Sequence, residues 1–471
     1  MTRFRHILHT LVPTLLLALL PCGVLGHQPE PPEQSATPTT HDTRISPIAP
    51  GWAGTSINAV VFRRNSIASH DGRQVVAFYD QQGRVVLAER VLDTTDEGEP
   101  AAWNLHTTQY SGNIRDAHNA ISIMLDGEGV LHMSWDHHGH PLRYCRSVAP
   151  GSLELTDMLP MTGSRERSVT YPEFYRTPGG DLVFFYRDGG SGRGDLVMNH
   201  YDTTTRTWTQ RQTNLIDGEG ERNAYWQACV DPRGSIHLSW VWRETGDVAT
   251  NHDLCYARSD DVGLTWHKTT GEAYDLPIRE ANAEYAARIP QQSDLINTTS
   301  MCANEDGLPA IATYWRPADQ DVPQFHVVHH DGRRWHTTQA SRRSTPFRLA
   351  GHGTRRIPIS RCQVLTRTLD DGARTLSLVY RDAERGSVVT LATCTGFPAG
   401  QWALTDLTDT SVGGWEPSYD TERWRTSGVL NLFLQHVGQG DGEGTEDIKP
   451  QMVSVLEWDP ASDVHAPHTP E

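Results

Sequence analysis

Imidazole, phenol and guanidinium side chains border short apolar runs in the first half of the chain. His118 and Tyr171 each precede such a run, His138 and Arg187 each follow the next one, and Tyr225 stands near the start of a further run. A guanidinium can hold a carboxylate in a fork, and a neutral imidazole can take a proton. A phenol can give a proton to a departing oxygen. This set suits β-elimination on a uronic acid, in which a proton is lost beside a carboxylate.

The elements that must position these side chains are strands. Short apolar runs between Gly, Asp and Asn turns recur along the whole chain, and no long amphipathic helical stretch interrupts them. A turn, an apolar strand that ends in an aromatic residue, a polar loop and another strand repeat about every 50 to 70 residues. The seven turns lie near Asp71, Asp126, Gly180, Asp231, Asp306, Asp371 and Ser427. Seven such units closing in a ring predict an all-β fold, a seven-bladed β-propeller.

The propeller geometry predicts which side chains meet. We expect the inner strands of the second, third and fourth blades at residues 118–125, 170–176 and 223–230. Consecutive strands of a blade are antiparallel, so the start of an inner strand and the end of the next strand lie on the same face. The residues expected together at this face are His118, Asn119, His138, Tyr171, Arg187, Tyr225 and Arg243.

One segment resembles a known structural turn. Ser259, Asp261, Gly263 and Trp266 form the pattern SxDxGxTW. The pattern resembles the Asp box of BNR-repeat propellers, which joins the third and fourth strands of a blade. It supports the fold and carries no chemistry.

Longer segments extend this resemblance to a family of enzymes. They are DAHNAISIMLDGEG, SWDHHGHPLRYCRS, VTYPEFYR, FFYRDGGSGRG, RNAYWQA, SWVWRE and NHDLCYARSDDVGLTW. Over residues 51–458 the chain resembles the BNR-repeat propeller polysaccharide lyases, which include ulvan lyases and L-rhamnose-α-1,4-D-glucuronate lyases.

The resemblance implies roles for individual residues. His118 matches the family histidine that removes the proton and can return it, and His138 matches the second histidine of the site. Tyr171 matches the family tyrosine, and Arg187 matches the arginine that neutralises the carboxylate. Tyr225 matches a further active-site tyrosine. We expect Asn119, Tyr225 and Arg243 to bind substrate.

The predicted activity is therefore cleavage of a rhamnose-(α1,4)-glucuronate linkage, as in ulvan or in the arabinogalactan side chains of gum arabic. A second interpretation is a hydrolase. A related α-L-rhamnosidase branch works from the opposite face through a histidine close to the FRRNS segment, where Arg64 stands here. A sialidase-like hydrolase is only weakly supported. Arg63 matches the arginine of the sialidase N-terminal motif, but the proline that usually follows this arginine is missing. A third interpretation, a non-catalytic carbohydrate-binding propeller, leaves the histidines and tyrosines unexplained.

One structural divalent cation, zinc or calcium, is compatible with the resemblance, and no organic cofactor is expected. His252 and Cys255, three apart in NHDLC, would supply two zinc ligands. A buried cysteine beside a surface histidine explains the same pair equally well. Calcium held by oxygen ligands stays equally open.

Charge limits the partners. The chain has 471 residues and a formal net charge of −17, which argues against nucleic acid or an anionic membrane as partner. An acidic polysaccharide would need a local cluster of Arg and His. We expect a monomer.

The ends of the chain predict export. Residues 1–26 read as a signal peptide, because Arg3 and Arg5 precede a short apolar stretch at residues 11–20. Residues 27–48 are predicted to be a flexible leader, 49–460 the propeller catalytic domain and 461–471 a tail. The protein is expected to be secreted or periplasmic. Six cysteines after the signal peptide are spread singly, and their spacing assigns no disulfide.

Overall fold

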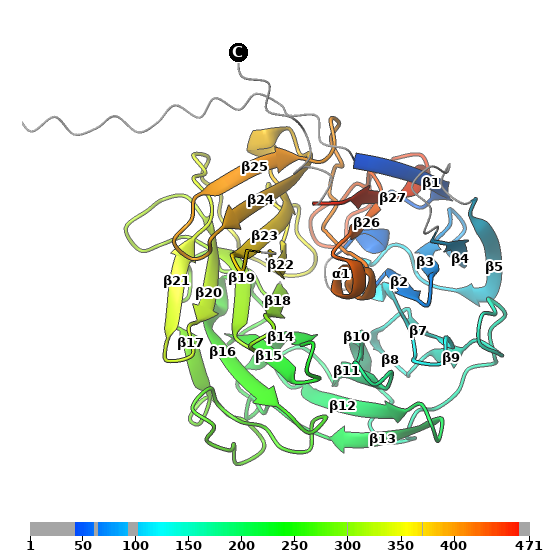
Figure 1. The fold of residues 1–471 in the computed structure, drawn as a ribbon, viewed down its shortest axis with the longest axis horizontal. Helices are drawn as coiled ribbons and strands as arrows, with labels where there is room; N and C mark the ends of the chain where they lie inside the picture. The colour runs from blue at the N-terminus through cyan, green and yellow to red at the C-terminus, as the bar shows by residue number, and fades with distance from the viewer. Residues whose placement is uncertain (1–42, 61–64, 93–101, 299, 370, 461–471) are drawn as a thin grey trace, which may run out of the picture. The chain divides into compact units, whose positions relative to one another are not determined.

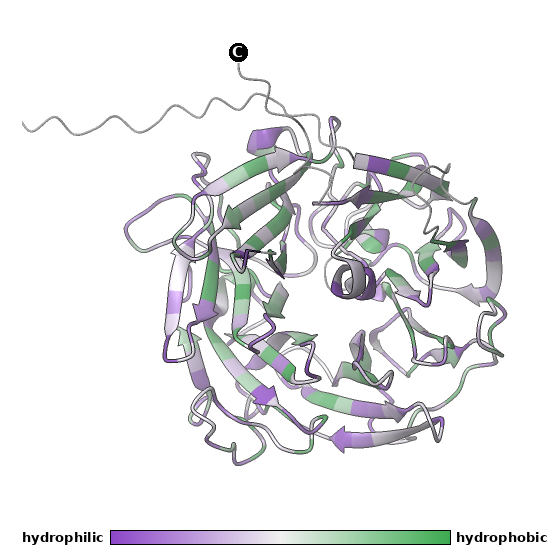
Figure 2. Cartoon of the chain, in the orientation of Figure 1, coloured by the Kyte–Doolittle hydropathy of each residue, from purple (hydrophilic) through white to green (hydrophobic). Residues whose placement is uncertain are grey.

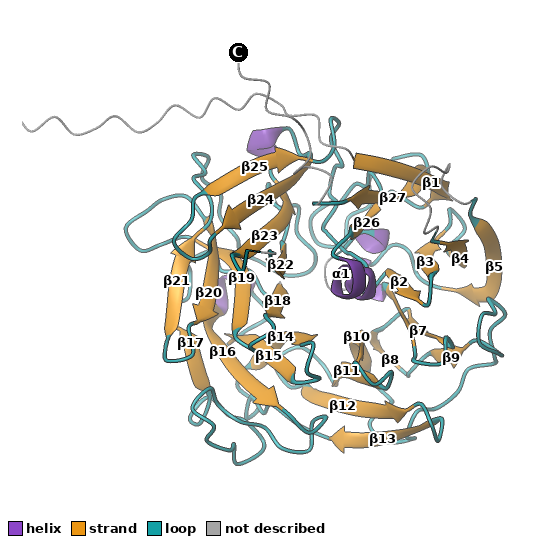
Figure 3. Cartoon of the chain, in the orientation of Figure 1, coloured by secondary structure: helices purple, strands orange, loops and turns teal. Residues whose placement is uncertain are grey.

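Seven β-sheets follow one another in chain order around a central axis (Figure 1). The computed structural model describes residues 43–60, 65–92, 102–298, 300–369 and 371–460. Strands dominate these residues, and α1 (Thr421–Ser427) is their one α-helix (Figure 3). Short 3-10 helices span Ser56–Asn58, Ala117–Asn119, Val248–Thr250 and Ala383–Arg385. The predicted all-β, seven-bladed propeller is confirmed.

The first three sheets lead up to the third, whose strands carry His138, Tyr171 and Arg187. The first consists of β2 (Ile67–His70), β3 (Arg73–Tyr79), β4 (Arg84–Val91) and β5 (Asn104–Ser111). The second consists of β6 (Ile121–Leu125), β7 (Leu131–Trp135) and β9 (Tyr144–Arg146). The third consists of β8 (His138–His140), β10 (Val169–Arg176), β11 (Leu182–Asp188), β12 (Asp195–Asp202) and β13 (Thr207–Gln212).

The next three sheets have four strands each. The fourth consists of β14 (Asn223–Val230), β15 (Ile236–Arg243), β16 (Asn251–Ser259) and β17 (Glu284–Ala287). The fifth consists of β18 (Ser300–Ala303), β19 (Pro309–Trp315), β20 (Gln324–His330) and β21 (Trp335–Gln339). The sixth consists of β22 (Gln363–Thr368), β23 (Arg374–Arg381), β24 (Val389–Thr395) and β25 (Trp402–Asp406).

The seventh sheet joins the two ends of the described chain. It consists of β26 (Leu430–Leu434), β27 (Gln451–Trp458) and β1 (Thr43–Gly51). Thr43 pairs with Trp458 and Gly51 with Gln451, so the first strand completes the last blade. This pairing closes the ring and leaves no unpaired first blade.

Short turns fix where the second strand of a blade begins. In the second blade, Asp126 Oδ1 accepts hydrogen bonds from the backbone N–H groups of Glu128 and Val130. Asp231 makes the same pair of bonds in the fourth blade. Gly129, with φ of +79°, supplies the left-handed residue of the turn. These local bonds explain why the Asp-centred turns mark the repeat in the sequence.

Hydrophobic residues recur along the strands (Figure 2), and they form buried clusters that extend across neighbouring sheets. Phe185 of β11 and Trp240 of β15 belong to one buried cluster, to which Ile311 of β19 also contributes. Trp415 belongs to a cluster between the last sheets and the first. The core is therefore a ring of interfaces between blades, which holds the strand ends in fixed positions around the axis.

Three details correct the expected boundaries. β1 begins at Thr43, so part of the segment expected to be a flexible leader up to residue 48 is paired with β27. The second inner strand begins at Ile121, because His118 lies in the 3-10 helix Ala117–Asn119. In the seventh blade α1 takes the place of the expected turn near Ser427. The signal peptide and the tail at 461–471 lie outside the described residues.

The Asp-box segment forms the predicted turn after β16. Ser259 Oγ donates to Asp261 and accepts from the Gly263 N–H at 2.8 Å each, and Trp266 is buried. Cys145, Cys229, Cys255, Cys302, Cys362 and Cys394 form no disulfide. Within the part of the chain that is described, no helix has the length and hydrophobicity that a membrane span requires.

Candidate active site

The residues predicted from neighbouring blades line one cavity. It has a volume of about 220 Å³ and lies where the inner strands start and the second strands end; we name it the front cavity. Its walls include His118, His138, Tyr171, Arg187, Tyr225 and Arg243. The structure therefore brings these six side chains together.

His118 is held by two carboxylates. The preceding Asp116 caps the 3-10 helix, and its Oδ1 bonds both the backbone N–H and the Nδ1 of His118, at 2.9 and 2.8 Å. Glu443 Oε1 lies 3.3 Å from the same Nδ1. Burial lowers the pKa of His118, but the two carboxylates outweigh burial and raise the pKa to about 9. His118 is therefore an imidazolium at neutral pH in the substrate-free protein.

His138 completes an imidazole pair. Its Nδ1 bonds Asp116 Oδ2 at 2.6 Å, and its ring stacks on that of His118 with centroids 4.1 Å apart. The short strand β8 pairs with Thr170 of β10, which carries His138 across to the edge of the third blade. Burial raises the pKa of Asp116, yet hydrogen bonds from both histidines lower it below its usual value. Asp116 thus stays ionised between the two rings.

Tyr171 is aimed into the cavity by a strained bulge. The register of β10 against β11 shifts between Thr170 and Glu173, and Tyr171 has φ of +57°. A bulge re-aims a side chain, and a left-handed non-glycine residue costs on the order of 1 kcal/mol or more. The ring lies 5.9 Å from that of His118. Burial and the neighbouring Tyr225 raise the pKa of Tyr171 to about 12, so it keeps its proton at neutral pH.

Arg187 is a buried cation without a carboxylate partner. It is 5% exposed, and its Cζ lies 5.0 Å from the ring centre of Tyr171. Among the residues that the structure describes, no carboxylate lies within 4.0 Å of its nitrogens, and Nε has no hydrogen-bond partner. A Cβ at Gly194 would lie 2.5 Å from Arg187 Cδ, so glycine is needed for the guanidinium to take this position. An uncompensated buried cation favours an incoming anion.

Tyr225 and Arg243 form the neighbouring wall. Arg243 Nη1 donates to Tyr225 Oη at 3.2 Å, and its Cζ lies 4.2 Å from the ring centre. The other bonds of Arg243 go to Asn251 and Asn297, which are neutral. Burial raises the pKa of Tyr225, but Arg243 and Arg187 outweigh burial and lower the pKa to about 8. This wall therefore carries positive charge toward the cavity.

Sequence reasoning missed the residues that control His118. Asp116 stands two residues before His118 within DAHN, so its capping position was a usable signal. Glu443 comes from a loop more than three hundred residues away, and no spacing could have found it. The segment at 349–361 also contributes His352, Arg355 and Arg361 to the cavity wall.

Some of the residues predicted from the sequence lie away from the front cavity: Asn119, and the pair His252 and Cys255. Asn119 is 1% exposed and donates to the backbone oxygen of Asn113, so it supports the loop and does not line the front cavity. His252 bonds Glu244 and Asp253 through its two nitrogens. Burial raises the pKa of the Cys255 thiol well above its usual value, which disfavours the thiolate that binds zinc. Neither residue belongs to the one described group of three metal-ligand types, so the zinc pair stays a prediction.

Within the described part of the chain, Asp116, His118 and His138 are the one group of three metal-ligand types whose ligand atoms lie within 4.8 Å of one another. Each of the two imidazoles bonds a different oxygen of Asp116 through its Nδ1, so one carboxylate links the two rings.

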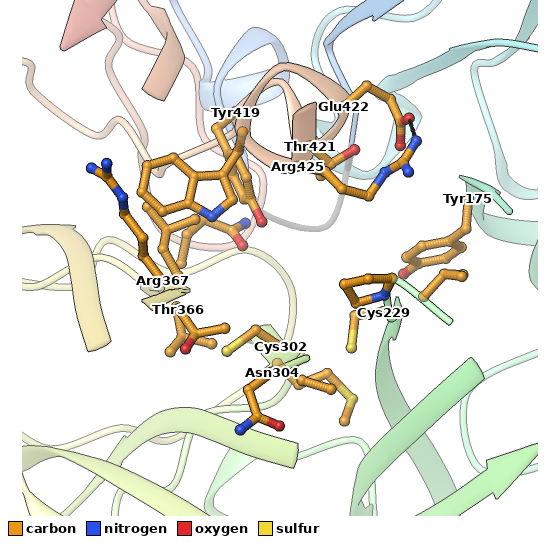
Figure 4. A pocket seen from close by; sticks show the side chains of 18 of the residues that line it. Tyr175, Cys229, Cys302, Asn304, Thr366, Arg367, Tyr419, Thr421, Glu422 and Arg425 are labelled. Carbon is orange, nitrogen blue, oxygen red and sulfur yellow. Dashed lines mark hydrogen bonds and ion pairs between the residues drawn. The ribbon is translucent and has the colours of Figure 1, made fainter. Parts of the chain in front are cut away.

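A second cavity, of about 370 Å³, lies at the other end of the axis and is named the rear cavity (Figure 4). Ends of inner strands line it, together with Tyr419 and α1. Glu422 is paired there with Arg176 and Arg425. Arg63 and Arg64, on which the comparison with hydrolases depends, lie outside the described residues.

The seven sheets and the cation-lined front cavity define a β-propeller protein with a polar site at one end of its axis. The model of BNR repeat-containing family members matches residues 73–343, more than half of the 471 residues. The chain belongs to this family, and the expected resemblance is confirmed.

Curated relatives include two ulvan lyases. The short isoform from Alteromonas sp. (strain LOR) is 24% identical over 242 residues, which cover 40% of this chain and 45% of that protein. The long isoform from Pseudoalteromonas sp. (strain PLSV) is 27% identical over 275 residues, covering 46% of this chain and 27% of that protein. The matched part thus spans less than half of either relative.

Solved structures share the fold. Polysaccharide lyase Uly1 superposes with a TM-score of 0.62 at 16% identity, over 84% of this chain and 90% of that chain. An ulvan lyase bound to -[GlcA(1-4)Rha3S]- superposes with a TM-score of 0.59 at 14% identity, over 87% and 97%. These likenesses confirm the propeller.

Proposed function

We propose that this protein is a polysaccharide lyase that cleaves a rhamnose-(α1,4)-glucuronate linkage by β-elimination. One observation carries the proposal: Arg187 is buried and has no carboxylate partner among the described residues, while His118 and Tyr171 share its cavity. The ulvan lyase relatives, two of them described above, support the same chemistry.

Arg187 can offset the negative charge that makes the C5 proton of the uronate hard to remove. The C5 proton of a uronate is weakly acidic because the adjacent carboxylate repels the developing negative charge. A guanidinium that binds this carboxylate offsets its charge and stabilises the carbanion. Because none of the described carboxylates pairs with Arg187, its guanidinium is available to the carboxylate of the substrate.

His118 and Tyr171 supply the proton transfers. His118 Nδ1 is held by Asp116, so we assign the C5 proton to Nε2 once the ring is neutral. The C5 electron pair forms the C4–C5 double bond, and the bond from C4 to the rhamnose oxygen breaks. Tyr171 is protonated at neutral pH and gives its proton to that oxygen. His138 and Asp116 hold the base in place.

The front cavity suits a hydrolase poorly. Most glycoside hydrolases need two carboxyl groups on opposite sides of the bond. No Asp or Glu is among the described residues that line the front cavity. A glycoside hydrolase that depends on such a carboxylate pair therefore lacks it among the described residues of this cavity.

The proposed substrate is an acidic polymer outside the cell. Ulvan and gum arabic are the two candidates, and the bound ligand of one solved relative contains glucuronate and a sulfated rhamnose. Export is proposed from the signal-like first 26 residues. N-terminal sequencing of protein recovered from the culture medium or periplasm should find cleavage near Gly26.

Ultraviolet absorbance tests the activity. A conjugated C4–C5 double bond absorbs where a saturated uronate does not. The wild-type protein should raise this absorbance with ulvan or with gum arabic, and the His118→Ala variant should not. Release of reducing ends by the wild-type protein without any rise in absorbance would contradict the proposal.

A further inference from the structure

A third cavity adjoins the front cavity between the sixth and seventh blades. It has a volume of about 540 Å³, and we name it the side cavity. Both cavities include Thr354, Arg355, Ile357 and Arg361 in their walls. A chain bound in the front cavity can therefore continue over Arg355 into the side cavity.

Two arginines that line the side cavity, Arg355 and Arg356, form only long ion pairs. Arg355 Nε lies 3.6 Å from Asp441, and Arg356 Nη1 lies 3.8 Å from Glu446. The side chains are 33% and 75% exposed. Exposed pairs at such separations contribute little, so both cations can turn to an incoming anion at small cost.

The back wall holds a buried cation. Arg381 is 6% exposed and donates to the backbone oxygens of Trp415, Ile357 and Pro358. Among the described residues no carboxylate lies within 4.0 Å of its nitrogens. Burial lowers its pKa, which reports the cost of keeping this charge away from water. Arg361 beside it is paired with Glu416 at 3.0 Å.

The charged side chains that line the front and side cavities are mostly positive, whereas the whole protein has a negative net charge. The chain carries a formal net charge of −17, so a polyanion is repelled at long range. The two joined cavities are nevertheless lined by six arginines against two glutamates, Glu416 and Glu446; the arginines are Arg187, Arg243, Arg355, Arg356, Arg361 and Arg381. A local track of arginine is what an extended acidic chain requires on an acidic protein.

We propose that the side cavity is a second anion subsite, which binds another acidic group of the same polysaccharide chain while the reacting uronate sits on Arg187. The acidic group is a carboxylate of a neighbouring uronate or a sulfate ester on the intervening rhamnose. The inference rests on the proposed function and deepens it, since it makes the substrate a polyanion with more than one charge.

Binding of defined oligosaccharides tests this subsite. Titration calorimetry uses a glucuronate–rhamnose-3-sulfate tetrasaccharide and its desulfated form, with His118→Ala as the background that prevents turnover. Adding Arg355→Ala and Arg356→Ala should weaken binding of the sulfated tetrasaccharide by about tenfold or more. Adding Arg333→Ala, an exposed arginine on the β20–β21 turn, should leave binding unchanged.

The two ligands identify the acidic group. A loss confined to the sulfated tetrasaccharide assigns the subsite to the sulfate ester, and an equal loss with both ligands assigns it to a uronate carboxylate. Binding unaffected by the double substitution would overturn the subsite even if the wild-type protein is a lyase.

Measurements of kcat and KM distinguish the proposed anion subsite from the proposed lyase activity. In the active background Arg356→Ala should raise KM for the tetrasaccharide severalfold and change kcat by less than about twofold. If the wild-type protein makes no unsaturated product yet the double substitution weakens binding, the subsite stands and the proposed reaction fails. If the wild-type protein does not bind the tetrasaccharide, both are wrong.

Discussion

The front and rear cavities lie at opposite ends of one axis and differ in chemistry more than in size. The rear cavity is the larger, about 370 Å³ against about 220 Å³. Its described lining includes Met301 and two cysteines, and Figure 4 shows Cys229 and Cys302 at its wall. Its acidic Glu422 is already paired with two arginines. The front cavity instead contains three imidazoles, two phenols and Arg187, a buried arginine with no carboxylate partner among the described residues.

This difference shows that volume alone does not locate a reaction. No histidine is among the described residues that line the rear cavity, so this described lining lacks the side chain whose ordinary pKa lies closest to neutral pH. In the front cavity the pKa values of three lining side chains move from their usual ranges because charges and burial act on them together. Perturbed groups that converge in one cleft are typical of a catalytic site.

The largest effect should come from removing the proposed base. His118→Ala should lower kcat by on the order of 10² to 10⁴, because general-base catalysis contributes that much. Initial rates of unsaturated-product formation measure it, and circular dichroism confirms the fold. A folded variant with near wild-type turnover would assign the base elsewhere.

Arg187→Ala should cost about a hundredfold or more in kcat, since a lost charge partner for a developing anion costs ~3 kcal/mol. The matched rear-cavity variant is Arg367→Ala, which removes a half-buried arginine that lines only that cavity. It should leave kcat within about twofold. The reverse ranking of the two variants would move the reaction to the rear cavity.

Gly194→Ala should lower kcat by roughly tenfold to a hundredfold, because the new Cβ would lie 2.5 Å from Arg187 Cδ and displace the guanidinium. Gly190→Ala in the same loop is the control, since its Cβ would come no closer than 3.5 Å to another side chain. Equal activity in both variants would show that the position of Arg187 is not critical. Thermal unfolding of both proteins separates lost positioning from lost stability.

The pH dependence should be the mildest of these effects. Because the pKa of His118 is raised to about 9, kcat/KM should increase with pH up to a midpoint near 9, where the base becomes neutral. Glu443→Gln removes one carboxylate that raises this pKa, so the midpoint should fall by about one unit. Asp447→Asn, an exposed change in the same loop, should leave the midpoint in place. A midpoint that does not respond to Glu443→Gln would exclude His118 as the titrating group.

Much of the fold could be predicted from the sequence because local bonds specify it. The carboxylates of Asp126 and Asp231 accept hydrogen bonds from backbone N–H groups of their own turns. Because these bonds are local, the turns mark the start of the second strand in the sequence without help from distant contacts. The meeting of His118, Tyr171 and Tyr225 followed from the repeat, since equivalent strand starts must share a face. A leader that reaches residue 48 was wrong, because only the partner strand β27 makes Thr43 part of a sheet.

Long-range contacts explain what could not be predicted. Glu443 lies in the long loop between β26 and β27 of the seventh blade and reaches His118 of the second blade, and nothing near either residue in the sequence indicates this contact. Asn119 stands beside His118 in the chain, yet its side chain turns to Asn113 and away from the cavity. The roles assigned to the individual side chains of the front cavity stay predictions until the variants are measured.

The most direct test of the central claim is the mass of the product formed in heavy-oxygen water. Elimination breaks the bond at C4 of the uronate without consuming water, whereas hydrolysis inserts one oxygen from the solvent. If the protein is a lyase, the product is an unsaturated uronate that carries no heavy oxygen. A saturated product with one heavy oxygen at the cleaved bond would contradict the lyase activity and establish a hydrolase.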